Sequence, residues 1–247
     1  YNHIGIQGVG MADVADSLTV LKKLVFDEPR VSREEILEAM RTNFEGKEVL
    51  RQIFLNRVPK YGNDIEEADE MAAWVAELYC DCVRGKATVR GGSFRPGLFC
   101  LSSNTPLGRQ VCALPSGRQA GTPLGDGGLS PKHSMDTHGP TAAARSVAKI
   151  PQTLAINGVN YNMKFLPSIL KTQEDRQKLT DLIRTYFSLG GMHIQFNVLT
   201  RETLLNAQKH PEKYRSLVVR VAGYSAFFVE LDRDIQNEII SRTEYGG

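Results

Sequence analysis

The sequence contains few cysteines, little net charge and no long apolar run, and each shortage excludes a class of protein. Its 247 residues carry 30 Lys and Arg against 28 Asp and Glu. This balance gives no indication of a nucleic-acid or membrane-surface partner. The apolar runs are too short to span a bilayer, and the first residues carry no leader pattern. We therefore expect a cytoplasmic protein. Because the chain opens on Tyr1 rather than Met, we do not expect its start to be a native N-terminus.

The four cysteines are Cys80, Cys82, Cys100 and Cys112. Cys80 and Cys82 are separated by one residue, which is closer than the usual spacing of metal ligands. The sequence has no second pair of cysteines that could complete a metal site with them. We therefore expect buried thiols in a reducing compartment rather than metal ligands or disulfides.

Strand-like and helix-like segments alternate along the chain, which is typical of the α/β class. Ser32 followed by Glu35 is a capping box and predicts the start of one helix. Large apolar residues at helical spacing, such as Val14, Leu18 and Leu78, are expected to face inward. Helices are predicted at residues 12–25, 32–44, 47–57, 63–83, 141–149, 172–189, 202–208 and 232–242, and strands at 3–9, 98–103, 110–114, 159–166, 192–199 and 217–222.

A stretch rich in Gly, Pro and Ser runs from residue 91 to residue 140. A loop-like region of this length is unusual in a compact domain unless it is functional. Asp126, His133, Asp136 and His138 lie within it, and their side chains are of a kind that binds metals. Clustered His and Asp in such a loop more often cap turns, so no metal site is expected here.

A glycine-rich turn joins the first predicted strand to the first predicted helix, with Gly5, Gly8 and Gly10. A dinucleotide-binding fingerprint needs a third glycine where this sequence has Asp13. A carboxylate at the start of a helix would repel a pyrophosphate, because both are negatively charged and the carboxylate already interacts with the positive end of the helix dipole. The segment is therefore interpreted as a tight strand-to-helix turn.

The segment from Arg220 to Ala226 reads Arg-Val-Ala-Gly-Tyr-Ser-Ala and follows a strand-like run. A lone glycine after a strand is ordinarily a turn residue. This heptad, however, closely resembles the signature of the glycyl radical enzymes, with Gly223 at the position of the radical. The resemblance extends along the chain, to residues 6–26, 113–118, 123–131, 139–146, 162–164, 193–198, 228–231 and 236–243.

The chemistry of a stored radical explains why a glycine is needed at this position. A radical at a Cα is stabilised by its peptide nitrogen and carbonyl when the carbon is planar, and a side chain would clash in the planar form. Burial would shield the radical from oxygen and from stray hydrogen donors. The apolar neighbours Val219, Val221, Phe227 and Phe228 therefore predict that Gly223 is buried.

The resemblance implies that a separate activating enzyme, which uses S-adenosylmethionine and a [4Fe-4S] cluster, installs the radical at Gly223, with no cofactor bound in this chain. It also implies that the radical passes to a cysteine, which in most relatives lies in a Gly-Cys-x-Glu loop where the glutamate moves protons. None of the four cysteines here has that context. We expect this loop on an N-terminal part or a separate subunit, and a homo-oligomer for the complete enzyme.

The fold that the resemblance implies is a ten-stranded α/β barrel. This chain would supply its second half, over residues 1–115, and a C-terminal glycyl radical domain, over residues 116–247. In relatives, the strand expected at 98–103 carries side chains that contact the substrate. Cys100 and Ser102 would share one face of that strand and Leu101 and Ser103 the other, and the sequence does not decide which face meets the pocket.

The expected reaction is that of a radical lyase: a dehydratase, a carbon–nitrogen or carbon–sulfur lyase, or a decarboxylase that acts on a small substrate. Two alternatives stay open. One is a non-catalytic replacement subunit that carries the glycyl loop to a damaged partner, and the other is a synthase that adds hydrocarbons to fumarate. A replacement subunit is expected to be shorter, so residues 5–166 would be surplus in it.

Overall fold

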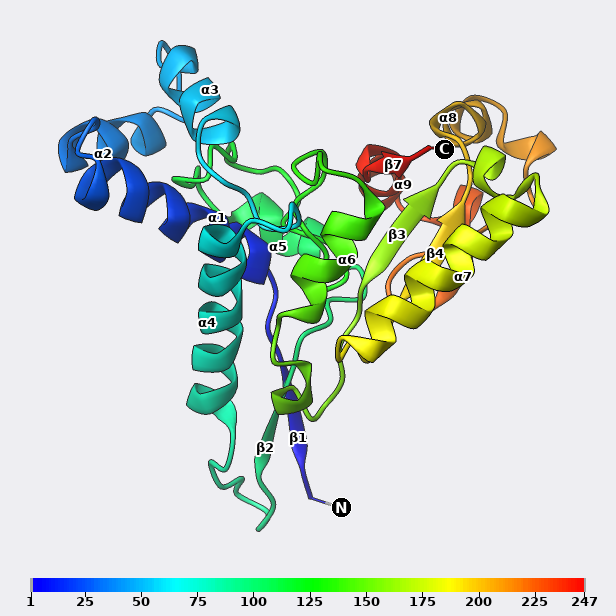
Figure 1. Ribbon diagram of the computed structural model, residues 1–247, viewed down its shortest axis with the longest axis horizontal. Helices are drawn as coiled ribbons and strands as arrows, with labels where there is room; N and C mark the ends of the chain where they lie inside the picture. The colour runs from blue at the N-terminus through cyan, green and yellow to red at the C-terminus, as the bar shows by residue number, and fades with distance from the viewer. Residues whose placement is uncertain (1, 247) are drawn as a thin grey trace.

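The computed structural model describes residues 2–246 (Figure 1). The helices are α1 (Met11–Leu21), α2 (Arg33–Arg41), α3 (Glu48–Asn56), α4 (Glu66–Val83), α5 (Asn104–Gln110), α6 (Pro140–Ala148), α7 (Gln173–Ser188), α8 (Arg201–Lys209) and α9 (Arg233–Ser241). A π-helical segment (Lys22–Asp27) extends α1, and short 3-10 helices lie at Gln152–Leu154, Pro167–Leu170, Pro211–Lys213 and Phe228–Glu230. The strands are β1 (Ile4–Gln7), β2 (Phe94–Gly97), β3 (Asn162–Phe165), β4 (Gln195–Val198), β5 (Val218–Arg220), β6 (Ser225–Phe227) and β7 (Glu244–Tyr245).

The strands form small sheets at separate places. β1 pairs with β2 in parallel, and β3 lies between β4 and β7, again in parallel. β5 and β6 form an antiparallel hairpin. In Figure 1, α4 lies beside β1 and β2 and α1 crosses the upper end of α4, while α7, α8 and α9 lie with β3 and β4. The alternation of helices with parallel strands is typical of the α/β class. The strands of residues 2–246 do not close a barrel by themselves.

Helices α1 and α4 pack against each other through small side chains. Ala15 of α1 and Ala72 and Ala76 of α4 are buried in one cluster. The larger Val14 and Leu78, which we expected to face inward, are instead 46% and 47% exposed. Because the distance between packed helices depends on the side chains at the contact, the alanines allow a close approach and the longer side chains remain outside.

Local signals set the starts of several helices correctly. The side chain of Ser32 accepts the N–H of Glu35, and the Glu35 carboxylate accepts the N–H of Ser32, which completes the expected capping box of α2. Gly10, just before α1, has a φ of 88°, and this confirms the tight strand-to-helix turn. Asp13 is buried there, and its Oδ2 accepts the N–H of Gly125 at 2.6 Å. Asp13 thereby ties the Gly/Pro-rich region to α1.

The strand expected at 98–103 is wrong beyond its first residue. Leu98 makes an isolated parallel bridge to Val159, and residues 101–103 form a turn in which Leu101 has a φ of 52°. The N–H of Cys100 donates to the carbonyl of Gly127 at 3.0 Å, so the Gly/Pro-rich region bends the chain here. The strand expected at 110–114 is also wrong, since α5 ends at its first residue and the following residues have no regular structure.

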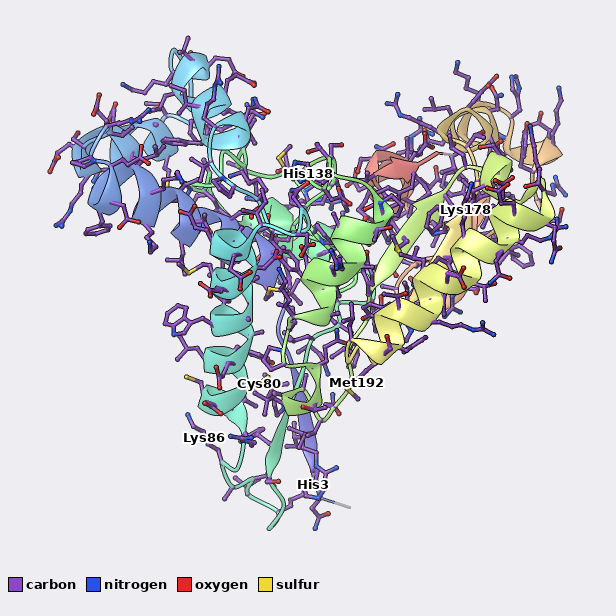
Figure 2. All side chains as sticks on the ribbon, viewed as in Figure 1. His3, Cys80, Lys86, His138, Lys178 and Met192 are labelled. Carbon is purple, nitrogen blue, oxygen red and sulfur yellow. The ribbon has the colours of Figure 1, made fainter. Side chains whose placement is uncertain are left out.

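The cysteines differ in exposure. Cys80 on α4 (Figure 2) is buried, as is Cys100, whereas Cys82 and Cys112 are exposed. Burial, expected for all four thiols, therefore holds for two of them. No helix within residues 2–246 combines the length and apolarity needed to cross a bilayer.

Candidate functional site

Gly223 lies in the turn of the β5–β6 hairpin. The N–H of Val221 donates to the carbonyl of Tyr224 at 2.9 Å, so Ala222 and Gly223 occupy the turn. Gly223 has a φ of 80°, in the left-handed region that glycine adopts without the steric penalty of other residues. The backbone of the hairpin therefore favours glycine before any chemistry is considered.

Gly223 is exposed, and the burial that its apolar neighbours predicted is wrong for this chain. Val219, Val221 and Phe228 are buried in a cluster with residues of α8 and α9, while Phe227 is 44% exposed. Successive residues of a strand point to opposite faces. The buried neighbours therefore cover one side of the hairpin and leave its tip open.

The turn at 101–103 brings one pocket candidate, Leu101, next to Gly223. Leu101 Cδ2 and Asn160 Nδ2 are the nearest atoms to the point that a Cβ on Gly223 would occupy, at 3.8 and 3.9 Å. These are ordinary van der Waals distances. A methyl group at Gly223 would therefore fit without displacing its neighbours.

The other three pocket candidates belong to the same turn. Cys100 is buried, and its Sγ lies 3.6 Å from Asn104 Oδ1. Burial, with the nearby carboxylate of Asp126, raises the pKa of Cys100 to about 12, so the thiol stays protonated at neutral pH. Ser102 and Ser103 are half-buried, and Ser103 Oγ donates to the carbonyl of Cys100 at 2.6 Å. The expected two-faced alternation does not hold in a turn, and contact with substrate stays a prediction.

A row of side-chain amides runs from Gly223 into the interior. Asn162 on β3 lies opposite Gln195 on β4 in the parallel register, so both side chains are on one face of the sheet. Gln195 Oε1 accepts the N–H of Gly223 at 3.2 Å, and Gln195 Nε2 donates to Asn162 Oδ1. Asn162 Nδ2 donates to the carbonyl of Val221 at 3.1 Å and to Asp126 Oδ2 at 2.6 Å.

Side chains of β4 also hold Arg220, the first residue of the heptad. Its Nη2 donates to Gln195 Oε1 at 2.9 Å, and its Nη1 donates to Ser225 Oγ at 3.0 Å across the hairpin. The N–H and carbonyl of Arg220 also bond to the side-chain amide of Asn197, each at 2.8 Å. The backbone on the N-terminal side of the glycine is thus fixed by β4.

Four charged side chains lie at the inner end of the amide row. Arg242 donates to both oxygens of Glu238 at 2.9 Å, a bidentate pair of the strong kind. Arg242 Nε also lies 3.4 Å from Asp126 Oδ2. His133 Nε2 is 3.0 Å from Asp126 and 3.2 Å from Glu238. The cluster joins the Gly/Pro-rich region to α9.

The electrostatics of this cluster keep all four groups charged. Burial opposes each charge, but Arg242 and His133 together hold the pKa of Asp126 and of Glu238 below the usual range of a carboxyl. In the same way, the two carboxylates outweigh burial and raise the pKa of His133 to about 9. Two positive and two negative groups thus balance at neutral pH.

Asp126, His133 and Glu238 present ligand atoms within 4.8 Å of one another, a spacing that could hold a metal ion. The bidentate contact of Arg242 with Glu238 and its closeness to Asp126 already provide the positive charge that an ion would bring. The donor set is therefore satisfied by protein groups, and we interpret it as an ion-pair cluster.

The other two metal candidates lie elsewhere in the Gly/Pro-rich region. Asp136 accepts hydrogen bonds from the hydroxyls of Thr243 and Tyr245. His138 lies just before α6 (Figure 2), where its Nδ1 lies 2.9 Å from the carbonyl of Asn63 and its backbone N–H donates to the Asn63 side chain at 3.0 Å. The four residues therefore do not meet at one point, and these two serve to fix turns.

Sequence reasoning gave no role to Gln195 and Asn162. A signal was present, because Asn162 and Lys164 alternate with apolar residues on β3, and Gln195 and Asn197 do so on β4. All four are buried. Polar residues at every second position of a short buried strand indicate a polar layer inside the fold, and that is where the amide row lies.

Comparison with known proteins agrees with this geometry. A sequence model described as glycine radical matches residues 126–229, and one described as pyruvate formate lyase-like matches residues 1–108. The chain belongs to the glycyl radical enzyme family. Gly223 and its hairpin fall within the first match, and α1 and α4 within the second.

The similar glycyl radical enzymes are much longer than this chain. A probable dehydratase of Escherichia coli strain K12 is 44% identical over 98% of this chain and 31% of its own length. The trans-4-hydroxy-L-proline dehydratase of Clostridioides difficile is 41% identical over 99% of this chain and 31% of its own. The solved glycerol-bound B12-independent glycerol dehydratase of Clostridium butyricum has a TM-score of 0.96 and 46% identity, over 100% of this chain and 31% of that one. The chain thus spans about a third of the length of these relatives.

Proposed function

We propose that this chain is the radical-storing part of a glycyl radical lyase and that Gly223 carries the radical. The observation that carries the proposal is the hairpin itself: the signature heptad places a glycine at its open tip, with the glycine N–H held by Gln195. A separate activating enzyme, with S-adenosylmethionine and a [4Fe-4S] cluster, would accept a hydrogen atom from Gly223. Gly223 would lose that atom from its Cα and keep the unpaired electron.

In the next step Gly223 would take a hydrogen atom from the S–H group of a cysteine. The S–H bond breaks, the Cα–H bond re-forms, and the unpaired electron passes to sulfur. Cys100 precedes Leu101, which lies next to Gly223, but Cys100 is buried with its thiol toward Asn104. We therefore place the acceptor cysteine outside this chain, on a Gly-Cys-x-Glu loop.

The chain would form the barrel part over residues 1–115 and the glycyl radical domain over residues 116–247, with the remaining strands of a ten-stranded barrel supplied from outside it. Two features support a larger assembly. Gly223 is exposed, although a stored radical needs cover from water and oxygen. A groove on α1 and α4 also leaves Phe26 and Trp74 more than half exposed, an arrangement typical of a surface that packs against more protein.

The reaction that we favour is the elimination of water from a small hydroxylated substrate. The three relatives reported above are all named dehydratases, one of them as probable. Each is at least 41% identical to this chain over the shared length. The turn that carries Cys100, Leu101, Ser102 and Ser103 lies beside Gly223 and is proposed to contribute to the pocket. The specificity of the pocket would depend mainly on residues outside this chain.

The test is the variant Gly223→Ala in the complete enzyme, activated under anaerobic conditions. The unaltered enzyme should give a doublet electron paramagnetic resonance signal, and the variant should give none, because its Cα cannot become planar as easily. The variant should still fold. A methyl group at Gly223 would meet no atom closer than 3.8 Å, and the left-handed φ costs about 1–2 kcal/mol.

Gly158→Ala is a matched control. Gly158 has a φ of 112°, and a methyl group there would meet no atom closer than 3.6 Å. This variant carries the same kind of backbone strain and should keep the doublet. A full doublet in Gly223→Ala would overturn the assignment. As a second readout, oxygen should cleave the activated chain at Gly223 and release a fragment that begins near Tyr224, detectable by mass spectrometry.

A further inference from the structure

Gln195 is the one side chain of the described residues whose polar atom hydrogen-bonds to the backbone of Gly223. Its orientation is forced by chemistry. The guanidinium of Arg220 and the N–H of Gly223 can only donate, so the Gln195 atom that faces both must be the carbonyl oxygen. Its two lone pairs match the two donors, at 2.9 and 3.2 Å. The amide nitrogen of Gln195 must then point inward.

The inner side of Gln195 is held as firmly as its outer side. Gln195 Nε2 donates to Asn162 Oδ1, and Asn162 in turn uses its nitrogen on the Val221 carbonyl and on Asp126. Asp126 accepts but cannot donate while it is ionised, and Arg242 and His133 hold its pKa low. Each amide in the row therefore has one possible orientation.

We propose that Gln195 is a positioning residue for the stored radical, acting through its hydrogen bond to the Gly223 N–H. This inference rests on the proposed function of Gly223. A Cα radical is stabilised when the neighbouring peptide nitrogen shares its lone pair with the half-filled orbital, which requires a fixed peptide plane. An acceptor on the N–H fixes that plane and also increases the electron density on nitrogen.

The rigidity of Gln195 gives this bond its effect. Gln195 is 7% exposed and lies on a strand that is paired with β3, whereas the tip of the hairpin is exposed to solvent. A water molecule at the tip could accept the same N–H, but it would not be oriented. Gln195 therefore joins an open, chemically reactive glycine to the ordered interior, and its bond to Arg220 fixes the first residue of the signature as well.

The experiment compares three variants of the complete, activated enzyme: Gln195→Leu, Gln195→Glu and the control Gln236→Leu. Gln236 is also 7% exposed and lies in the same domain, but its Nε2 donates to the carbonyls of Phe228 and Leu231. The readout is the coupling of the exchangeable amide proton of Gly223 to the radical. It is measured by electron–nuclear double resonance in light and heavy water, together with the lifetime of the doublet.

Gln195→Leu should shift the amide-proton coupling and shorten the lifetime of the radical about fivefold, a factor that corresponds to one lost neutral hydrogen bond. Gln195→Glu keeps an acceptor, and because a charged acceptor bonds more strongly, it should move the coupling in the opposite direction. Gln236→Leu should leave the coupling unchanged, even if it lowers stability as much. If Gln195→Leu fails to fold, the shift in Gln195→Glu still decides the matter.

An unchanged coupling in both Gln195 variants, or an equal shift in Gln236→Leu, would overturn the role of Gln195 while leaving Gly223 as the radical store. The absence of a doublet in the unaltered enzyme would overturn the proposed function itself. The two failures are therefore distinguishable.

Discussion

Where α1 packs against α4, the contact cluster consists of alanines and a few larger apolar residues, whereas the buried carboxylates of α1, Asp13 and Asp16, accept the backbone N–H groups of Gly125 and Tyr61. Ala15, Ala72 and Ala76 are buried, and they have no polar group to satisfy. Apolar contacts of this kind depend on area and shape, and they do not impose a direction on any one bond. Such an interface sets how closely two helices approach, and it tolerates small rotations.

The region around Gly223 is built in another way. Between the hairpin and α9, the interior contains amides and charges in which each donor has a defined acceptor. Buried polar groups are costly unless they are all satisfied, and a satisfied network fixes one geometry. The comparison suggests that the two regions have different roles: apolar packing supports the scaffold, and directed hydrogen bonds set the orientation of the peptide that we propose stores the radical.

The largest expected effect comes from removing the one guanidinium of the polar cluster. Arg242→Met would leave Asp126 and Glu238 buried, with His133 as their remaining ion-pair partner among residues 2–246. Breaking a buried ion pair by removing one partner typically costs about 3–5 kcal/mol. We expect a loss of that size in the free energy of unfolding, measured by urea denaturation.

Arg145→Met is the matched control for this prediction. Arg145 is 57% exposed and pairs with Asp64, and exposed pairs contribute about 0–1 kcal/mol. The comparison between the two regions would break down if the two arginine variants lost similar stability, because the polar cluster would then be no more important than a surface pair.

The next largest effect is a pH dependence of stability that comes from His133 in the polar cluster. His133 has an ordinary pKa of 6.5 when unfolded and about 9 when folded. A raised pKa means that its stabilising contribution is complete below about pH 6.5 and is lost as the pH rises through about 9. The difference corresponds to about 3 kcal/mol. Denaturation between pH 6.5 and 9.5 should therefore show falling stability.

His133→Gln supplies the check on this slope. Glutamine keeps a donor near Asp126 and Glu238 but has no proton to lose in this range, so the variant should be less stable at pH 6.5 and nearly flat up to about pH 8. At higher pH the thiols of Cys80 and Cys100, whose pKa burial raises, add a slope to both proteins. If the same slope persisted in His133→Gln, its source would lie in another group, and the cluster would not be the pH-sensitive part of the molecule.

The same contrast decides what could be predicted from the sequence. Signals that act over a few residues were reliable, as with Ser32 and Glu35 at the start of α2. The inward faces of α1 and α4 were right for Ala68, Met71 and Val75, but Val14 and Leu78 are exposed, because the close contact between the two helices is made by small side chains. Leu101 was placed on a strand because its turn depends on contacts with Gly127, a residue distant in sequence.

At the candidate site, only residues within the signature heptad could be predicted from the sequence. Gly223 could be named from its heptad, and its place in a tight turn follows from glycine chemistry. The partner of its N–H could not be named, because Gln195 reaches it only through the pairing of β3 with β4. Residues of the α7 segment separate these strands, and nothing in either strand alone fixes the register between them. The exposure of Gly223 was missed because apolar neighbours describe one face of a hairpin and not its tip.

The smallest expected effect tests the apolar side of the comparison. Ala72→Leu inserts a larger side chain where α4 packs on α1, and such overpacking typically costs about 1–3 kcal/mol. Glu77→Leu introduces the same side chain at an exposed position of the same helix and should change stability little, because Glu and Leu have similar helix propensities. In the activated enzyme, Ala72→Leu should lower the denaturation midpoint yet leave the amide-proton coupling of Gly223 unchanged, since the hairpin is oriented by Gln195 and not by the α1–α4 contact. A shifted coupling in Ala72→Leu would mean that the scaffold also sets the orientation of the radical peptide, and the division between the two regions would have to be abandoned.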